Sequence, residues 1–124
     1  MPADYRAPLA DMQFILHELI PFSTINSLPA YQEVSDDLVN TILEEASKFA
    51  KEVLGPLNWT GDQEGCSYSE GLVKTPQGFK TAYQHYIEAG WISLAANADF
   101  GGQGLPITLA TPVNEMWHSA NMAF

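Results

Sequence analysis

The segment from Ser35 to Leu54 restricts the fold of this chain more than any other part of the sequence. Its apolar residues recur every three or four positions, which places them on one face of an α-helix: Leu38, Val39, Ile42, Leu43, Ala46, Phe49, Ala50, Val53 and Leu54. Ser35 is a suitable N-cap, and the aspartates that follow it suit the positive end of the helix dipole. We expect Gly55-Pro56 to end or kink this helix, because proline has no N–H group to donate.

Three more helices are expected on similar grounds. The stretch 8–19 has apolar residues at helical spacing with polar residues between them. Thr75-Pro76 offers an N-cap followed by proline at the first helical position, so a helix is predicted from there to Gly90. A last helix is predicted over about 106–119, although Pro112 is awkward inside it.

The segments between these helices lack a regular period. Residues 21–29 are bracketed by prolines and are interpreted as a loop or a short helical turn. Residues 61–74, rich in glycine and polar residues, are interpreted as an irregular connection. Because no segment alternates apolar and polar residues for more than a few positions, we predict an all-α fold, a small helical bundle.

The chain ends on Asn121-Met122-Ala123-Phe124, with apolar side chains and no polar tail. Domains usually end in better solvated residues, so we expect a cut through a larger protein. In that case the surface around Trp117, Met122 and Phe124 should be exposed and promote self-association or partial unfolding. The alternative is that these residues fold back into the local core.

Composition excludes several classes of function. Fifteen acidic residues against five basic ones give a net charge of −10, with no cluster of Lys or Arg, which argues against nucleic acid and anionic membranes as partners. No apolar run is long enough to span a membrane. Cys66 is alone, and the N-terminus does not resemble a signal peptide, so a reducing, cytoplasmic location is expected.

Residue chemistry alone gives no catalytic or metal site. His17, His85 and His118 lack the spacing of metal ligands, and Cys66 has no nearby cation to activate its thiol. The acidic pairs of the long helix are interpreted as a solvated face. Packing in the core explains the helically spaced aromatic residues without a flavin-stacking role: Phe79, Tyr83, Tyr86 and Trp91.

Three closely spaced glycines, Gly101, Gly102 and Gly104, invite comparison with phosphate-binding loops. The spacing does not fit, because a dinucleotide-binding pattern starting at Gly102 requires glycine where Ile107 stands, and no Lys-Ser/Thr pair follows. The residues favour a structural turn, with a ligand loop as the alternative.

Three stretches read together resemble the acyl-CoA dehydrogenase family. Phe100-Gly101-Gly102-Gln103-Gly104, preceded by Leu94-Ala95-Ala96, resembles the family's aromatic-Gly-Gly-x-Gly loop. The stretch 113–117 is similar to the Glu-containing helix after that loop, and 45–58 to the family's first long helix. The family often has proline shortly before its aromatic-Gly-Gly, whereas this chain has Asn97, Ala98 and Asp99, which also suit a turn.

The opening stretch 5–14 further resembles the N-terminal extension of longer bacterial members, which act on fatty acyl or methylthio-propanoyl thioesters. The resemblance therefore implies an extension over residues 1–34, with one amphipathic helix, and an incomplete N-terminal helical domain over 35–124. The family's flavin-binding β-domain, second helical domain and catalytic glutamate all lie beyond the matching stretch.

The resemblance implies an FAD-dependent enzyme of fatty acid metabolism that takes the α-hydrogen of an acyl-CoA as a proton and passes the β-hydrogen as hydride to flavin N5. Neither role falls on a residue here, and Glu115 matches a helix position, not the base. The segment alone is expected to be inactive and free of flavin, while the full protein takes acyl-CoA and an electron acceptor and forms a homo-oligomer.

By position in the family, the backbone of Gly101, Gly102 and Gly104 and the side chains of Met122 and Phe124 are candidate walls of the acyl pocket. Packing against the missing domains is the alternative for these residues. A second hypothesis for the whole chain is a free-standing helical module that binds a partner protein through its apolar end.

Overall fold

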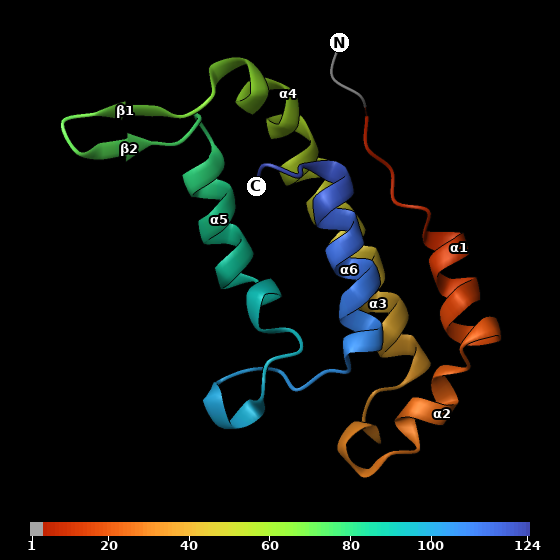
Figure 1. Cartoon of the computed structure of the whole chain (residues 1–124). Helices are drawn as coiled ribbons and strands as arrows, with labels where there is room; N and C mark the ends of the chain where they lie inside the picture. Colours follow the sequence, from red (N-terminus) through yellow and green to blue (C-terminus); the bar gives the residue numbers. More distant parts are fainter. Residues whose placement is uncertain (1–3) are drawn as a thin grey trace.

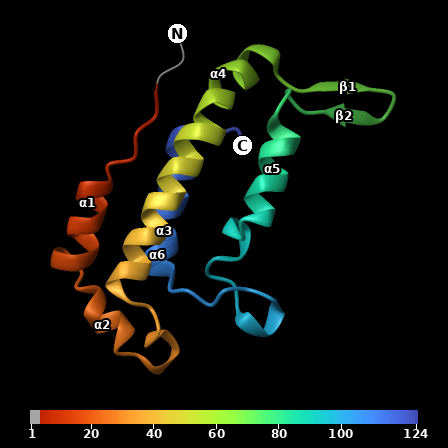
Figure 2. The same cartoon turned by 180° about the vertical axis from the view of Figure 1, so that it is seen from behind.

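The computed structural model describes residues 4–124 and has two long helical segments at its centre. Helices α3 (Asp36–Phe49) and α6 (Ile107–Ala120) lie side by side, with α1 (Leu9–Phe14) on one side of the pair and α5 (Phe79–Glu88) on the other (Figures 1 and 2). The chain is a helical bundle with one small hairpin, which confirms the predicted fold class.

The helix predicted from Ser35 is confirmed and runs further than expected. The Ser35 hydroxyl accepts a hydrogen bond from the Leu38 N–H at 3.2 Å, as an N-cap does. The helix then passes through a π-helical turn, Ala50–Leu54, into α4 (Gly55–Glu64). Gly55 donates to the carbonyl five residues earlier, so the proline that follows is accommodated by widening the turn instead of ending the helix.

The remaining short elements connect these helices. The predicted helix over 8–19 is present as α1 followed by a π-helical turn, Ile15–Leu19, and α6 continues through Pro112. Short helices fill the other connections: α2 (Phe22–Asn26) and the 3₁₀ turns Pro29–Tyr31, Trp91–Ser93 and Ala98–Phe100.

The interpretation of 61–74 as an irregular connection is wrong. Helix α4 continues to Glu64, and strands β1 (Ser67–Ser69) and β2 (Leu72–Lys74) form an antiparallel hairpin that projects beside α4 (Figure 1). Glu70 (φ 50°) and Gly71 (φ 81°) make the two-residue turn, a conformation that suits the twist of a hairpin. Strands of three residues are too short to show alternation.

The predicted start of α5 at Thr75-Pro76 is also wrong. The helix begins at Phe79, and Gly78, with φ of 90°, occupies the position before it. The left-handed conformation of Gly78 redirects the chain from the hairpin into the helix, which a residue with a Cβ rarely permits.

One core joins the elements. Its buried apolar residues come from the N-terminal segment, the long helix, α5, the segment after α5, and α6: Met12, Leu16, Phe22, Val34, Val39, Leu43, Ala46, Ala50, Leu54, Ala82, Leu94, Leu109, Ala110, Val113, Met116, Trp117 and Ala120. The division of the chain at residue 34 stays a prediction. Over residues 4–124, no helix has the length and apolar character needed to cross a bilayer.

Aromatic rings fill the space between the central helices and α5. The Trp117 ring meets Phe49 at 5.4 Å, Trp91 at 5.3 Å and Tyr86 at 5.9 Å between ring centroids, all in edge-on arrangements. The expectation that Trp117 is exposed is therefore wrong, since it is only 6% exposed. Tyr86 and Trp91 pack as predicted, whereas Tyr83 is 48% exposed.

Candidate functional site

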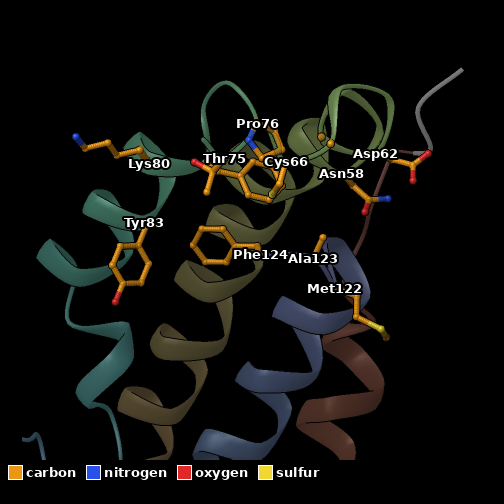
Figure 3. Close-up of a pocket in the computed structure, with 13 residues that line it drawn as sticks. Asn58, Asp62, Cys66, Thr75, Pro76, Lys80, Tyr83, Met122, Ala123 and Phe124 are labelled. Atoms are coloured by element: carbon orange, nitrogen blue, oxygen red, sulfur yellow. The ribbon is translucent and has the colours of Figure 1, made fainter. Parts of the chain in front are cut away.

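An open groove lies where the end of α4, the base of the hairpin, the start of α5 and the C-terminal tail meet. It has a volume of about 760 Å³, within the range of small-molecule sites. Figure 3 shows Tyr83 and Lys80 on one side, Asn58 and Asp62 on the other, and Phe124 between them. Most of its lining is apolar, so the groove suits an apolar group better than a charged one.

Two glycines allow the helices to approach closely at this groove. A Cβ on Gly61 would lie 2.6 Å from the ring of Phe79, and a Cβ on Gly78 would lie 2.7 Å from the Leu57 side chain. Both contacts are shorter than side chains tolerate. The glycines thus place the start of α5 directly against α4, and Phe79 becomes a wall of the groove.

Polar groups lie mainly at the rim. The Glu64 carboxylate accepts a hydrogen bond from the Gln77 N–H at 2.8 Å, which fixes the connection from the hairpin to α5. Cys66 is exposed, and the side chain of Lys80 points away from the centre of the groove (Figure 3). None of these groups forms an acid–base pair with another across the described lining, which is mostly apolar.

The C-terminal tail supplies the remaining wall. Phe124 packs against the aromatic residues of α5, with centroid distances of 5.6 Å to Tyr86, 6.3 Å to Phe79 and 6.4 Å to Tyr83. Met122, in the same tail, is 78% exposed. Phe124 therefore forms a packed wall of the groove, whereas the Met122 side chain is open to solvent.

A second, smaller hollow of about 190 Å³ adjoins the groove and shares Tyr83, Met122 and Phe124 with it. Its lining includes Trp117, whose indole N–H is buried and has no hydrogen-bond partner within residues 4–124. Burial raises the pKa of Tyr86, another lining residue, above its ordinary value, and the nearby Tyr83 adds to the shift. The Tyr86 side chain therefore contributes a neutral hydroxyl to this hollow at physiological pH.

The glycine loop is a closed turn at the other end of α6, away from the C-terminus (Figure 1). Its backbone N–H groups donate to carbonyls of the same segment: Phe100 and Gly102 to Asn97, Gly101 to Ala98, Gln103 to Ser93, Gly104 to Ala96 and Leu105 to Leu94, at 2.9 to 3.0 Å. The Asn97 side chain caps the turn by accepting from the Asp99 N–H at 2.8 Å.

The five residues predicted to line a pocket therefore fall into two groups. Met122 and Phe124 line the groove described above, whereas Gly101, Gly102 and Gly104 belong to the distant loop. The structure does not bring the two groups together. Whether either group contacts an acyl chain stays a prediction.

Within residues 4–124, the glycine loop and the aromatic cluster do not fit a flavin. A dinucleotide needs free backbone N–H groups facing its diphosphate, and those of the glycine loop are already hydrogen-bonded within the loop. The aromatic rings that could stack on an isoalloxazine instead pack on one another. Within residues 4–124, no three His, Cys, Asp or Glu side chains are grouped to hold a metal ion.

Sequence reasoning missed most of the groove. Asn58, Gly61 and Thr75 line it, but the sequence places them at the end of the family-like helix over 45–58, in the expected connection over 61–74 and at the expected N-cap of the next helix. A usable signal was present in Gly61 and Gly78, which each face a large apolar side chain across the α4–α5 contact. Such a pairing becomes visible only once the two helices are placed side by side.

Comparison with known proteins gives one consistent group of relatives. The chain is 37% identical over 120 residues to 3-methylmercaptopropionyl-CoA dehydrogenase of Ruegeria pomeroyi. It is 28% and 29% identical to two butyryl-CoA dehydrogenases of Syntrophomonas wolfei, over 122 and 125 residues. The matches cover 95–97% of this chain but only 20% of each relative's length. No protein-family model matches the chain.

Proposed function

We propose, from its similarity to acyl-CoA dehydrogenases, that the chain forms the N-terminal helical segment of an FAD-dependent enzyme of this family. In the full protein the reaction is the α,β-dehydrogenation of an acyl-CoA thioester. The segment alone is inactive, because the residues for the chemical step and for the flavin lie outside it.

One observation carries the proposal: the similarity extends over 97% of the chain at 37% identity. A similarity of that extent involves the helices, the hairpin and the glycine loop together, and not a single motif. Because the chain spans about a fifth of the length of these relatives, the proposal assigns it a part of the enzyme and not the whole.

The groove indicates what the segment contributes to the enzyme. We assign Phe124, together with Met122, to the wall of the acyl pocket, because Phe124 forms a packed wall beside an apolar hollow of ligand size. Gly101, Gly102 and Gly104 are weaker candidates for the wall of the acyl pocket, since the N–H groups of their loop are hydrogen-bonded within the loop. Their role is to hold a tight turn before α6.

The substrate class follows from the relatives. Those proteins are named for butyryl-CoA and 3-methylmercaptopropionyl-CoA, both thioesters of short acyl groups, and we propose a short acyl-CoA for the protein that contains this segment. A homo-oligomer, an external electron acceptor and a cytoplasmic location in fatty acid metabolism complete the proposal.

The proposal is tested with the longest reading frame that contains this sequence. The purified protein is assayed for reduction of an artificial electron acceptor with a panel of acyl-CoAs from four to sixteen carbons, including 3-methylmercaptopropionyl-CoA. We expect bound flavin and the highest kcat/KM with short acyl groups. A protein that lacks flavin and oxidises no member of the panel would contradict the proposal, while a preference for long chains would contradict only the substrate class.

A further inference from the structure

Asn121 is a polar residue placed in an apolar environment, directly after the end of α6. It is only 3% exposed, and its neighbours Ala120 and Leu54 are also buried. A buried amide is costly unless its hydrogen-bonding groups find partners. Its position therefore needs a structural or functional explanation.

Both ends of the Asn121 side chain have a partner. Its Nδ2 donates to the carbonyl of Leu54 at 3.2 Å, at the junction where the π-helical turn meets α4. Its Oδ1 accepts from the N–H of Phe124 at 3.2 Å, and the main-chain carbonyl of Asn121 accepts from the same N–H at 3.3 Å. The side chain thus connects the long helix to the C-terminal tail across 67 residues of sequence.

The position of Phe124 matters because its ring stands between two hollows. The groove of about 760 Å³ and the smaller hollow of about 190 Å³ share Phe124, Met122 and Tyr83 in their linings. Of the three, Phe124 is the one whose own backbone is bonded by Asn121. A shift of the tail would therefore change the wall that limits the groove.

We propose that Asn121 is a positioning residue, which holds Phe124 as the wall between the two hollows and so limits the length of acyl chain that the protein accepts. This inference rests on the proposed function. Asn121 also lines the smaller hollow, and in this proposal it acts through the position of the Phe124 ring. The hydrogen bond to Leu54 ties the position of that ring to the π-helical turn of the long helix.

The test uses the full-length protein with Asn121→Ala and the acyl-CoA panel. We expect KM for short acyl groups to rise about fivefold while kcat per bound flavin changes less than about twofold, and the preference to move toward longer chains. Asn26→Ala is the matched control, because Asn26 also donates its side-chain amide to a backbone carbonyl, that of Val34 at 3.4 Å, but far from the groove. If Asn121 only stabilises the fold, Asn121→Ala and Asn26→Ala should both lower the free energy of unfolding, and both should keep the wild-type chain-length profile.

A double-mutant cycle with Phe124→Ala separates positioning from other effects. If Asn121 acts through Phe124, adding Asn121→Ala to Phe124→Ala gives no further change in the profile. Should Asn121→Ala not fold, Asn121→Ser, which keeps a hydroxyl for one of the two bonds, is measured instead and should give an intermediate shift. An active enzyme whose Asn121 variants keep the wild-type profile overturns this inference, whereas a wild-type protein without acyl-CoA oxidation overturns the proposed function itself.

Discussion

At the scale of single residues, glycines set the shape of the loop before α6. A Cβ on Gly102 would lie 2.0 Å from the carbonyl oxygen of Ala96, a contact with backbone that no rotamer change can relieve. Gly101 has a φ of 83° but open space around it. Position 102 thus requires glycine because a Cβ has no space there, whereas position 101 favours glycine because its backbone is left-handed.

These reasons predict different costs. Gly101→Ala should lower the free energy of unfolding by about 1–2 kcal/mol, the cost of a left-handed residue with a Cβ. Gly102→Ala should lower it by about 3 kcal/mol or more, because the loop must move to relieve the clash. Urea denaturation followed by circular dichroism measures both. Equal losses in the two variants would show that the loop relaxes easily around Gly102.

Tyr5 gives a second residue-scale prediction, on alkaline stability. Burial, and next the charge of Glu115, raise the pKa of Tyr5 above its ordinary value of 10.0; the nearby Ser119 opposes the shift but falls short of a full hydrogen bond. A pKa that is higher in the folded state gives stability that is present below pH 10 and is lost as pH rises through the folded value.

Tyr5→Phe removes this ionisation. Because the buried hydroxyl has no hydrogen-bond partner, the variant should match the wild type within about 0.5 kcal/mol at pH 8, or exceed it. Above pH 10 it should lose less stability than the wild type. Urea denaturation at pH 8 to 11 checks this, with Tyr68→Phe in the exposed hairpin as control. If the free energy of unfolding fell equally with pH in the wild type and in Tyr5→Phe, the raised pKa of Tyr5 in the folded state would be contradicted.

At the scale of elements, the hairpin and the central helices differ most in expected stability. All six strand residues are exposed, whereas α3 and α6 contribute much of the core. An isolated two-stranded hairpin is marginally stable in water. We therefore expect its amides to exchange with deuterium well before those of α3 and α6, in hydrogen-exchange mass spectrometry of the 124-residue chain.

The exchange rate of the hairpin also reports on what covers it. In a longer protein that packs against the hairpin, its amides should become protected, while those of α3 stay slow. Protection of the hairpin in the dilute isolated chain, equal to that of α3, would contradict the exposed arrangement described here.

The sequence predicted elements well where one face is buried over several turns. The stripe from Leu38 to Leu54 and the cap at Ser35 predicted α3, because helical periodicity is a local property that packing then reinforces. The same reasoning failed at the hairpin, where no face is buried, and at Pro56, where a wider turn absorbs the missing N–H. For the site, the family resemblance named Phe124 and Met122, but nothing in the sequence placed Gly61 or Asn121 beside them, since that depends on tertiary contacts.

At the scale of the whole molecule, apolar side chains remain exposed near the groove. Tyr68, Leu72 and Val73 of the hairpin and Met122 of the tail are 67–78% exposed. Large apolar patches on a protein surface usually mark a partner or a neighbouring domain. We therefore expect the isolated chain to self-associate, with a sedimentation coefficient that increases with concentration.

Charge at the hairpin should suppress this association. The double variant Leu72→Lys and Val73→Lys should stay monomeric at concentrations where the wild type associates. Ile107→Lys is the control, because Ile107 is 73% exposed but lies at the start of α6, away from the hairpin. A wild-type chain that is a monomer at every concentration would contradict the prediction.

We propose that these 124 residues are part of a larger flavoenzyme. The most direct test of this proposal is the intact mass of the protein from its native source, measured together with its visible absorption spectrum. Since the segment corresponds to 20% of the length of its relatives, we expect a protein about five times as long as this chain, with the yellow absorbance of bound flavin. A colourless protein of 13.6 kDa would contradict it and leave the helical interaction module as the remaining hypothesis.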